Sequence, residues 1–145
     1  MVREATFEDL DDLLELYLHL HETDVPERDE RLMKTWAGIL ADDNHHILVD
    51  EQAGTLVASC VCVVVPNLTR AARPYALVEN VVTRADYRRR GCARACLDRA
   101  RQIARQAGCY KIMLMTGSKS EGTLDFYRNC GYNAADKTAF IQWLP

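Results

Sequence analysis

Hydrophobic and polar positions change their period at the centre of this chain, which predicts a strand followed by a helix. Residues 76–83 are mostly aliphatic and β-branched, as in a buried strand. Between Ala93 and Ala107 apolar residues return at intervals of three and four, which places them on one face of a helix that ends at Gly108. A short basic turn joins the two elements, residues 87–94, with the sequence Tyr-Arg-Arg-Arg-Gly-Cys-Ala-Arg.

The same patterns predict two helices before this unit and strands on either side of it. Thr6 and Asp9 form a capping-box pattern ahead of a leucine-rich helical stripe, and Pro26 separates that helix from a second one. The expected strands cover residues 2–5, 45–50, 55–65, 76–83, 109–115 and 139–144, and the expected helices begin near residues 10, 29, 93 and 122. The predicted element order is β-α-α-β-β-β-α-β-α-β.

Helices that bracket a run of strands favour an α/β (α+β) fold, with a single mixed sheet and helices on both faces. A length of 145 residues fits a single domain over residues 1–145. No apolar run approaches the roughly 20 residues that a membrane span needs. The N-terminus is not followed by the apolar segment of a signal peptide. We therefore expect a cytoplasmic protein with no membrane partner.

Charge is divided unevenly along the chain. Residues 1–52 hold 15 Asp and Glu against 4 Lys and Arg, whereas residues 53–145 hold 6 against 14. The acidic half could attract a cationic substrate over long range, or it could be no more than a solvated face. The basic residues lack interleaved aromatic side chains and any known reader motif, so the sequence does not favour a nucleic-acid partner.

Six cysteines raise the question of a metal site or a reactive thiol. No Cys-x-x-Cys pair occurs and the pair His45–His46 is distant in sequence, so we expect no metal. Most of the cysteines should be reduced and buried. Cys92 differs, because a helix N-terminus and neighbouring arginines would lower the pKa of its thiol and make it reactive.

The basic turn combines three features that suit a pyrophosphate. A helix N-terminus presents unpaired backbone N–H groups and a partial positive charge. Gly91 lets a ligand approach the backbone, and the arginines before it add mobile positive charge. The turn lacks the three glycines of a dinucleotide fingerprint and the Gly-Lys-Ser/Thr ending of a P-loop. It therefore predicts either a phosphate cradle of another kind or a solvated basic turn.

Two segments in the expected order carry a resemblance to a known family. Residues 88–93 look like the Arg/Gln-x-x-Gly-x-Gly/Ala loop of the GNAT superfamily of acyl-CoA-dependent N-acetyltransferases, and residues 124–132 resemble its Phe-Tyr-Glu-Lys-x-Gly-Phe segment. The element order also matches that superfamily, whose sheet is mostly antiparallel. Residues 78–88 and 108–112 are similar to glucosamine-6-phosphate N-acetyltransferases, but Met115 stands where that group carries an acidic residue of its sugar site.

The resemblance implies acetyl-CoA as a co-substrate, no metal, and roles for particular residues. Backbone groups of Val81, Val82 and Thr83 would pair with the pantetheine arm, and Tyr127 would be the general acid for the departing thiolate. Glu79 is the candidate base, because burial in an apolar strand would raise its pKa, with ordered water as the alternative. The cofactor-binding turn would comprise Arg88, Arg89, Arg90, Gly91, Cys92, Ala93 and Arg94.

The expected function is therefore an acetyl-CoA-dependent N-acetyltransferase that acts on the primary amine of a small molecule by direct attack in a ternary complex. One alternative is acetylation of a protein lysine or N-terminus, which needs an open groove between residues 66–74 and 133–137. Another is a CoA-binding sensor or interaction module without catalysis. Domains of this kind are often homodimers. The sequence fixes neither the acceptor nor the acyl chain.

Overall fold

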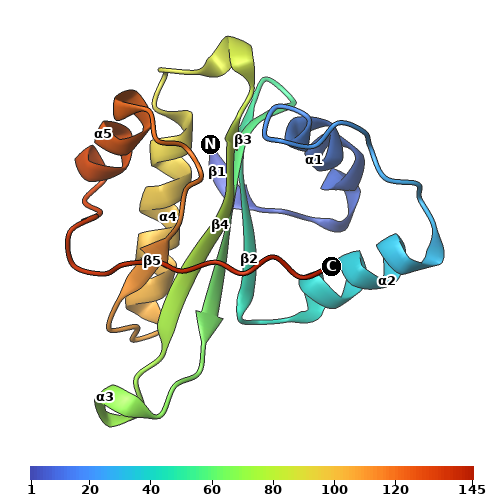
Figure 1. The fold of residues 1–145 in the computed structure, drawn as a ribbon. Helices are drawn as coiled ribbons and strands as arrows, with labels where there is room; N and C mark the ends of the chain where they lie inside the picture. The colour runs from blue at the N-terminus through green and yellow to red at the C-terminus, as the bar shows by residue number, and fades with distance from the viewer.

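A five-stranded sheet forms the centre of the protein, described here by a computed structural model of residues 1–145 (Figure 1). The strands lie side by side in the order β1-β2-β3-β4-β5, and every neighbouring pair is antiparallel except β4 and β5, which are parallel. This confirms the predicted mixed, mostly antiparallel sheet. The strand bounds are β1 Val2–Glu4, β2 His45–Gln52, β3 Thr55–Val65, β4 Tyr75–Thr83 and β5 Ile112–Leu114.

Helices cover both faces of the sheet, as predicted. In Figure 1 α4 and α5 lie on one face, and α1 and α2 lie on the other. Their bounds are α1 Leu10–Tyr17, α2 Glu30–Ala41, α4 Cys92–Gln106 and α5 Glu121–Asn129, with short 3-10 turns η1 Phe7–Asp9 and η2 Ala85–Tyr87. None of the helices is long and apolar enough to cross a membrane.

The start of the first helical segment follows its capping pattern. The Asp9 carboxylate accepts hydrogen bonds from the Thr6 backbone N–H at 2.6 Å and from the Thr6 hydroxyl at 3.1 Å. Arg3 donates two further hydrogen bonds to the same carboxylate, at 2.7 and 2.9 Å. The Thr6–Asp9 pair was predicted from its capping motif, whereas no sequence motif indicates the Arg3–Asp9 pair.

Two apolar layers hold the helices against the sheet. One layer packs α4 onto alternating residues of β3 and β4, among them Cys60, Cys62 and Val78. The other packs α1 and Trp36 of α2 onto the opposite sides of the same strands, among them Val61. Both layers exist because side chains of a strand alternate between the two faces of a sheet.

Two segments differ from the expected elements. No strand forms at residues 139–144: the chain after α5 runs across the front of the molecule without pairing, and its side chains are exposed (Figure 1). The segment between β3 and β4, where no element was expected, contains the short turn α3, Thr69–Ala72, in which Arg70, Ala71 and Ala72 have left-handed φ values of 56 to 59°. The apolar pattern of residues 139–144 fits a strand, but no neighbouring strand receives it.

Candidate functional site

A β-bulge interrupts β4 at the centre of the sheet. Ser59 of β3 pairs with Val82 and Val61 pairs with Glu79, so two residues of β4 lie opposite the single residue Cys60. Asn80, inside the bulge, has a left-handed φ of 51°. A bulge of this kind bends its strand and redirects the backbone that follows it.

Beyond the bulge, β4 has one free edge. β5 pairs with β4 only from Ala76 to Val78, whereas β4 continues to Thr83. The backbone of residues 79–83 is therefore bonded to β3 on one side only. Unpaired strand edges of this kind receive extended ligands by main-chain hydrogen bonds. Val81, Val82 and Thr83, which were predicted to act through their backbone, lie on this free edge.

The basic turn follows this free edge and leads into α4. Gly91 is the N-cap residue of α4 with a φ of 82°, and a Cβ placed there would meet nothing within 4 Å. Arg89, two residues earlier, also has a left-handed φ, of 62°. Turns with such residues bring successive backbone N–H groups toward a common centre, and the helix N-terminus adds further unpaired N–H groups.

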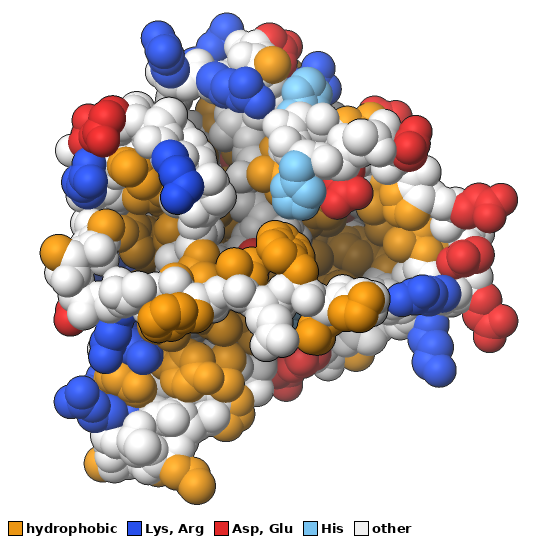
Figure 2. All heavy atoms as spheres, in the orientation of Figure 1, with side chains coloured by type: hydrophobic (Ala, Val, Ile, Leu, Met, Phe, Trp, Pro, Cys, Tyr) orange, Lys and Arg blue, Asp and Glu red, His pale blue; other side chains and the backbone are white.

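The arginines of the turn are exposed and only weakly engaged. Arg88 donates to the backbone carbonyl of His19 at 3.2 Å, and Arg90 lies over the ring of Tyr87 at 4.9 Å. Arg94 approaches Asp98 at 3.9 Å on the helix surface. In Figure 2 basic side chains gather at the top of the molecule, above a hollow between the two helical layers. The positive charge is thus available to an incoming anion.

The prediction of an acidic, reactive thiol at Cys92 is wrong. The Cys92 side chain is buried, and burial is the main cause that raises the pKa of its thiol, with Asp50 as the next. The sulfur accepts a hydrogen bond from Gln52 at 3.4 Å and donates to the carbonyl of Tyr87 at 3.8 Å. The arginine side chains are exposed to solvent, whereas the Cys92 thiol points into the protein. The guanidinium groups therefore do not contact the thiol, although they are its neighbours in sequence.

Tyr127 lies on α5 and packs against the same apolar layer as Val81. It is half-buried and meets the rings of Phe126 and Tyr132 edge-on, at centroid distances of 5.0 and 6.3 Å. Burial raises the pKa of its phenol, which is protonated at neutral pH even without that shift. The fold thus brings the predicted acid and the free edge of β4 to one layer.

Glu79 does not have the environment expected from the sequence. It was selected because an apolar strand would bury its carboxylate, but the side chain is exposed. The bulge follows it immediately, and the neighbouring Asn80 is exposed as well. The Glu79 carboxylate is therefore in contact with bulk water.

A cavity of about 270 Å³ adjoins the bulge on the side of α1. Tyr17 and Asn80 both line it, and burial raises the pKa of Tyr17 to about 12, an effect that the nearby Asn80 side chain partly offsets. The full lining is Leu14, Tyr17, Leu20, His21, Glu22, Asp24, Pro26 and Asn80. Sequence reasoning missed Tyr17 and Asn80 because they lie on different elements; the only signal in the sequence was a polar Asn, a residue type that tolerates a left-handed φ, within an apolar run.

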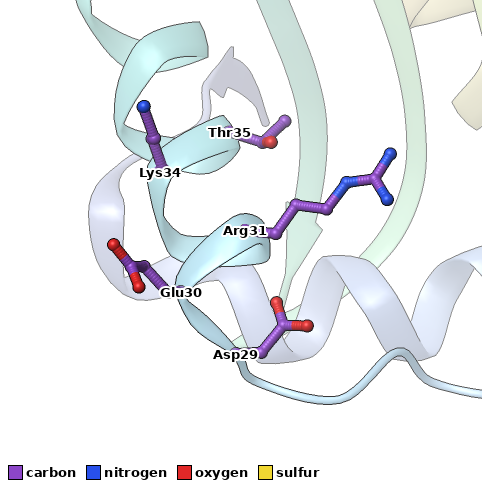
Figure 3. A pocket seen from close by; sticks show the side chains of 5 residues that line it. All are labelled: Asp29, Glu30, Arg31, Lys34 and Thr35. Atoms are coloured by element: carbon purple, nitrogen blue, oxygen red, sulfur yellow. The ribbon is translucent and has the colours of Figure 1, made fainter.

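Two further features lie away from this site. The larger hollow shown in Figure 3, about 450 Å³, is lined only by residues of the start of α2, namely Asp29, Glu30, Arg31, Lys34 and Thr35. It contains no residue of β4 or of the basic turn, so we do not assign it to the site. The structure contains no group of three or more His, Cys, Asp or Glu side chains that could hold a metal ion.

Comparisons with known proteins agree with this geometry. The sequence profile of the acetyltransferase (GNAT) family matches residues 10–132. A glucosamine 6-phosphate N-acetyltransferase of Trypanosoma brucei brucei is 31% identical over 105 residues, 72% of this chain and 67% of that protein. An uncharacterized N-acetyltransferase of Methanocaldococcus jannaschii is 27% identical over 99% of this chain and 64% of its own length. This chain thus spans about two thirds of each relative.

A solved structure supports the same assignment. A protein of Agrobacterium tumefaciens str. C58, assigned as an acetyltransferase, superposes with a TM-score of 0.90 and 38% sequence identity over 99% of both chains. The matched profile begins at α1 and ends just after α5, so it includes the bulge, the basic turn and Tyr127. The chain therefore belongs to the GNAT family of N-acetyltransferases.

Proposed function

We propose that this protein transfers the acetyl group of acetyl-CoA to the primary amine of a small molecule, by direct attack within a ternary complex. The observation that carries the proposal is the continuity of two features: the free edge of β4 after the bulge leads directly into the glycine and arginine turn before α4. One edge suits an extended amide-containing arm, and the turn suits the pyrophosphate at its end.

Each part of the site has one task in this proposal. Backbone groups of Val81, Val82 and Thr83 hold the arm and place the thioester carbonyl near a backbone donor, which stabilises the oxyanion. The turn from Arg88 to Arg94 binds the pyrophosphate through N–H groups and mobile guanidinium groups. Holding both substrates in contact removes much of the entropic cost of the reaction.

The chemical step has two proton transfers. The neutral amine attacks the thioester carbon, a C–N bond forms and the C–S bond breaks. Tyr127, whose phenol is protonated at neutral pH, gives its proton to the departing thiolate. The proton of the attacking amine leaves through ordered water, with the exposed Glu79 as a carboxylate that can relay it.

The cavity beside the bulge supports a cationic acceptor. Glu22 and Asp24 line it, and no Lys or Arg does. A phosphate group would find only the imidazole of His21 as a basic partner there, whereas a second amino group would be attracted by both carboxylates. We therefore expect small diamines or polyamines to be better acceptors than amino-sugar phosphates, in contrast to the glucosamine 6-phosphate after which the Trypanosoma relative is named.

An acceptor panel with acetyl-CoA tests the proposal, with free thiol as the readout. The panel contains diamines and polyamines, amino acids, amino sugars and their phosphates, aminoglycosides, and lysine peptides. Turnover on a small amine supports the proposal, whereas turnover on peptides alone supports protein acetylation. Tight CoA binding with no turnover on any member would contradict the proposal in favour of a sensor.

Tyr127→Phe, run in the same assay, tests the role of the phenol. The ring contacts are kept, so CoA affinity and folding should be unchanged, while kcat falls about 10- to 100-fold. Tyr110→Phe is the matched control, because Tyr110 packs beside Tyr75 at the other end of the sheet. An unchanged kcat in Tyr127→Phe would show that Tyr127 contributes only through the packing of its ring.

A further inference from the structure

The segment that follows α1 lies against the connection between β4 and α4. Residues 18–29 join α1 to α2, and we call them the α1–α2 segment. Within it, His19 accepts two hydrogen bonds from that connection. The backbone N–H of Ala85 donates to the imidazole Nδ1 at 3.3 Å, and the Arg88 guanidinium donates to the backbone carbonyl at 3.2 Å. One residue of the α1–α2 segment thus bridges two parts of the fold that are distant in sequence.

The two contacts hold the short turn η2 at both of its ends. Ala85 is the first residue of η2, and Arg88 is its C-cap. The first N–H groups of a helical turn have no partner inside the turn, and the N-cap residue Arg84 makes no side-chain cap hydrogen bond. His19 therefore supplies from another element the cap that the local sequence lacks. Because η2 leads directly into the basic turn, its orientation sets where that turn begins.

The side-chain contact requires a neutral imidazole. A ring nitrogen accepts a hydrogen bond only when it carries no proton, so Nδ1 of His19 is bare and the ring proton lies on Nε2. A protonated ring would place its own N–H against the N–H of Ala85. The cap of η2 therefore exists with the neutral ring and is lost when the ring takes up a proton.

Charged groups near His19 favour that change when the ring is protonated. Asp86 of η2 is close enough for a charge interaction with the imidazole, so a protonated ring would be attracted to its carboxylate and away from Ala85. The other charged or titratable groups of this neighbourhood are Arg84, which donates to Asp86 at 3.3 Å, Arg88 at the His19 carbonyl, and the pair His21 and Glu22 of the same segment, 3.6 Å apart.

The α1–α2 segment also forms one wall of the cavity beside the bulge. His19 lies between the cavity residues Tyr17 and Leu20 in sequence, but its own contacts are with η2. The other residues that this segment contributes to the cavity are His21, Glu22, Asp24 and Pro26. A change at His19 therefore reaches both the cavity wall and the start of the basic turn.

We infer that His19 is a positioning residue: in its neutral form it caps η2 and holds the start of the basic turn against the wall of the acceptor cavity, and protonation releases this contact. The inference rests on the proposed function, which assigns CoA to the basic turn and the acceptor to the cavity. A single hydrogen bond between partly exposed neutral groups adds little to global stability. The effect of His19 is therefore expected in binding and not in folding.

Titration calorimetry with CoA, at about pH 7.5 and about pH 5.5, tests the positioning role. His19→Asn keeps a neutral acceptor near the position of Nδ1 and cannot be protonated, whereas His19→Ala removes the acceptor. At the higher pH, wild type and His19→Asn should bind CoA equally, and His19→Ala about 2- to 10-fold more weakly, the change that one neutral hydrogen bond supplies. At the lower pH the wild type should fall to the level of His19→Ala, while His19→Asn keeps its advantage.

Ratios between variants remove the other titrations from this comparison. The phosphate of CoA also changes its charge near about pH 6, but it does so with every variant. His45→Asn is the matched control, because His45 begins β2 beside Val63, at the opposite end of the sheet from Thr83, and should keep the pH response of the wild type. A ratio of wild type to His19→Asn that is equal at both pH values would overturn the inference, and so would full CoA affinity in His19→Ala.

Nuclear magnetic resonance tests the cap itself, without CoA and without activity. The amide signal of Ala85 should shift between about pH 7.5 and about pH 5.5 in the wild type and stay fixed in His19→Asn. The imidazole nitrogens of His19 should show the Nε2–H tautomer at the higher pH. An Ala85 signal that follows pH equally in both proteins would contradict the cap.

The two measurements also separate this inference from the proposed function. A wild-type protein that binds no CoA at either pH would overturn the proposed function and the positioning role together, whatever the Ala85 signal shows. A wild-type protein that binds CoA with a constant ratio to His19→Asn would overturn the positioning role alone.

Discussion

At the scale of single residues, the side chain and the backbone of Cys92 face different environments. The thiol is buried against Gln52 and Tyr87, while the residue opens α4 beside exposed arginines. Turning the side chain inward keeps it from obstructing the helix N-terminus. A side chain as small as that of cysteine fits both a phosphate-binding turn and the apolar core. The sequence therefore did not show that the Cys92 thiol is buried, and the prediction of a lowered pKa was wrong.

Tyr132 tests the effect on stability of a buried hydroxyl without a hydrogen-bond partner. Its hydroxyl is buried and has no hydrogen-bond partner. Tyr132→Phe should therefore leave the free energy of unfolding unchanged or raise it by about 1 kcal/mol, because it removes a desolvated polar group and keeps the ring. Urea denaturation at neutral pH measures this. A clear loss of stability would indicate that the hydroxyl has a bound water as its partner.

The Arg3–Asp9 pair predicts a specific response to acid. Arg3 is the first cause that lowers the pKa of Asp9 from 3.8 to about 2. Because the folded-state pKa is depressed, the stabilisation is present above pH 3.8 and is lost as the pH falls through about 2. Asp9→Asn should lower the free energy of unfolding at pH 7 by about 1 kcal/mol, since Arg3 is partly exposed to water.

Denaturation at pH 7 and again near pH 2 checks this. The difference between Asp9→Asn and the wild type should shrink at the lower pH, where Asp9 is protonated in the unfolded state and about half protonated in the folded state. Asp43→Asn serves as the control, because Asp43 is exposed in a turn and should show little difference at either pH. An Asp9→Asn deficit of equal size at both values would assign the effect to the cap at Thr6 rather than to the ion pair.

At the scale of elements, local signals placed most helices and strands where the structure has them. The helical stripe from Ala93 onward became α4, and the aliphatic run at residues 76–83 became β4. The helix expected to begin near residue 122 is α5, and its N-cap Ser120 accepts from the N–H of Thr123 at 3.3 Å. Such boundaries are predicted well because caps and periodicity depend on neighbours in sequence.

Two glycines predict opposite outcomes for the same substitution. Gly91→Ala should destabilise the protein by about 1 kcal/mol, because a left-handed φ of 82° strains any residue with a Cβ. Gly38→Ala, in the middle of α2 with an ordinary φ and free space around it, should stabilise by a similar amount.

Thermal denaturation of both variants measures these signs. Gly91→Ala should also weaken CoA binding, since the turn is part of the proposed cradle, whereas Gly38→Ala should not. Opposite signs in stability with equal CoA affinity would separate the backbone of Gly91 from phosphate binding and leave the turn with a structural role.

At the scale of the whole molecule, the uneven charge of the sequence becomes a spatial division. The acidic first part of the chain builds β1, α1, α2 and β2, and the basic second part supplies the turn before α4. In Figure 2 most acidic side chains lie over α1 and α2, where some basic ones also lie, and the other basic side chains lie at the top and on the opposite side. An anionic donor and a cationic acceptor would therefore be attracted to different sides of the bulge.

Salt dependence tests the basic side of this division. Arg88→Ala with Arg90→Ala should weaken CoA binding about tenfold or more at low salt and flatten its dependence on salt, because two exposed cations are removed. Arg99→Ala with Arg105→Ala changes the net charge equally on α4 and should have a much smaller effect. Titration calorimetry at several salt concentrations compares the two. Identical curves would remove the phosphate role from the turn.

The sequence by itself determined the class of the sheet, the helices on both faces, the basic turn and Tyr127 on α5, because periodicity, caps and glycine positions are local properties. Only the tertiary structure decided which side chains meet. It created the bulge at Asn80, buried the thiol of Cys92, exposed Glu79, and joined Tyr17 to Asn80 across a cavity. It also left residues 139–144 without the strand partner that their pattern anticipates, because pairing needs a neighbour that no local pattern specifies.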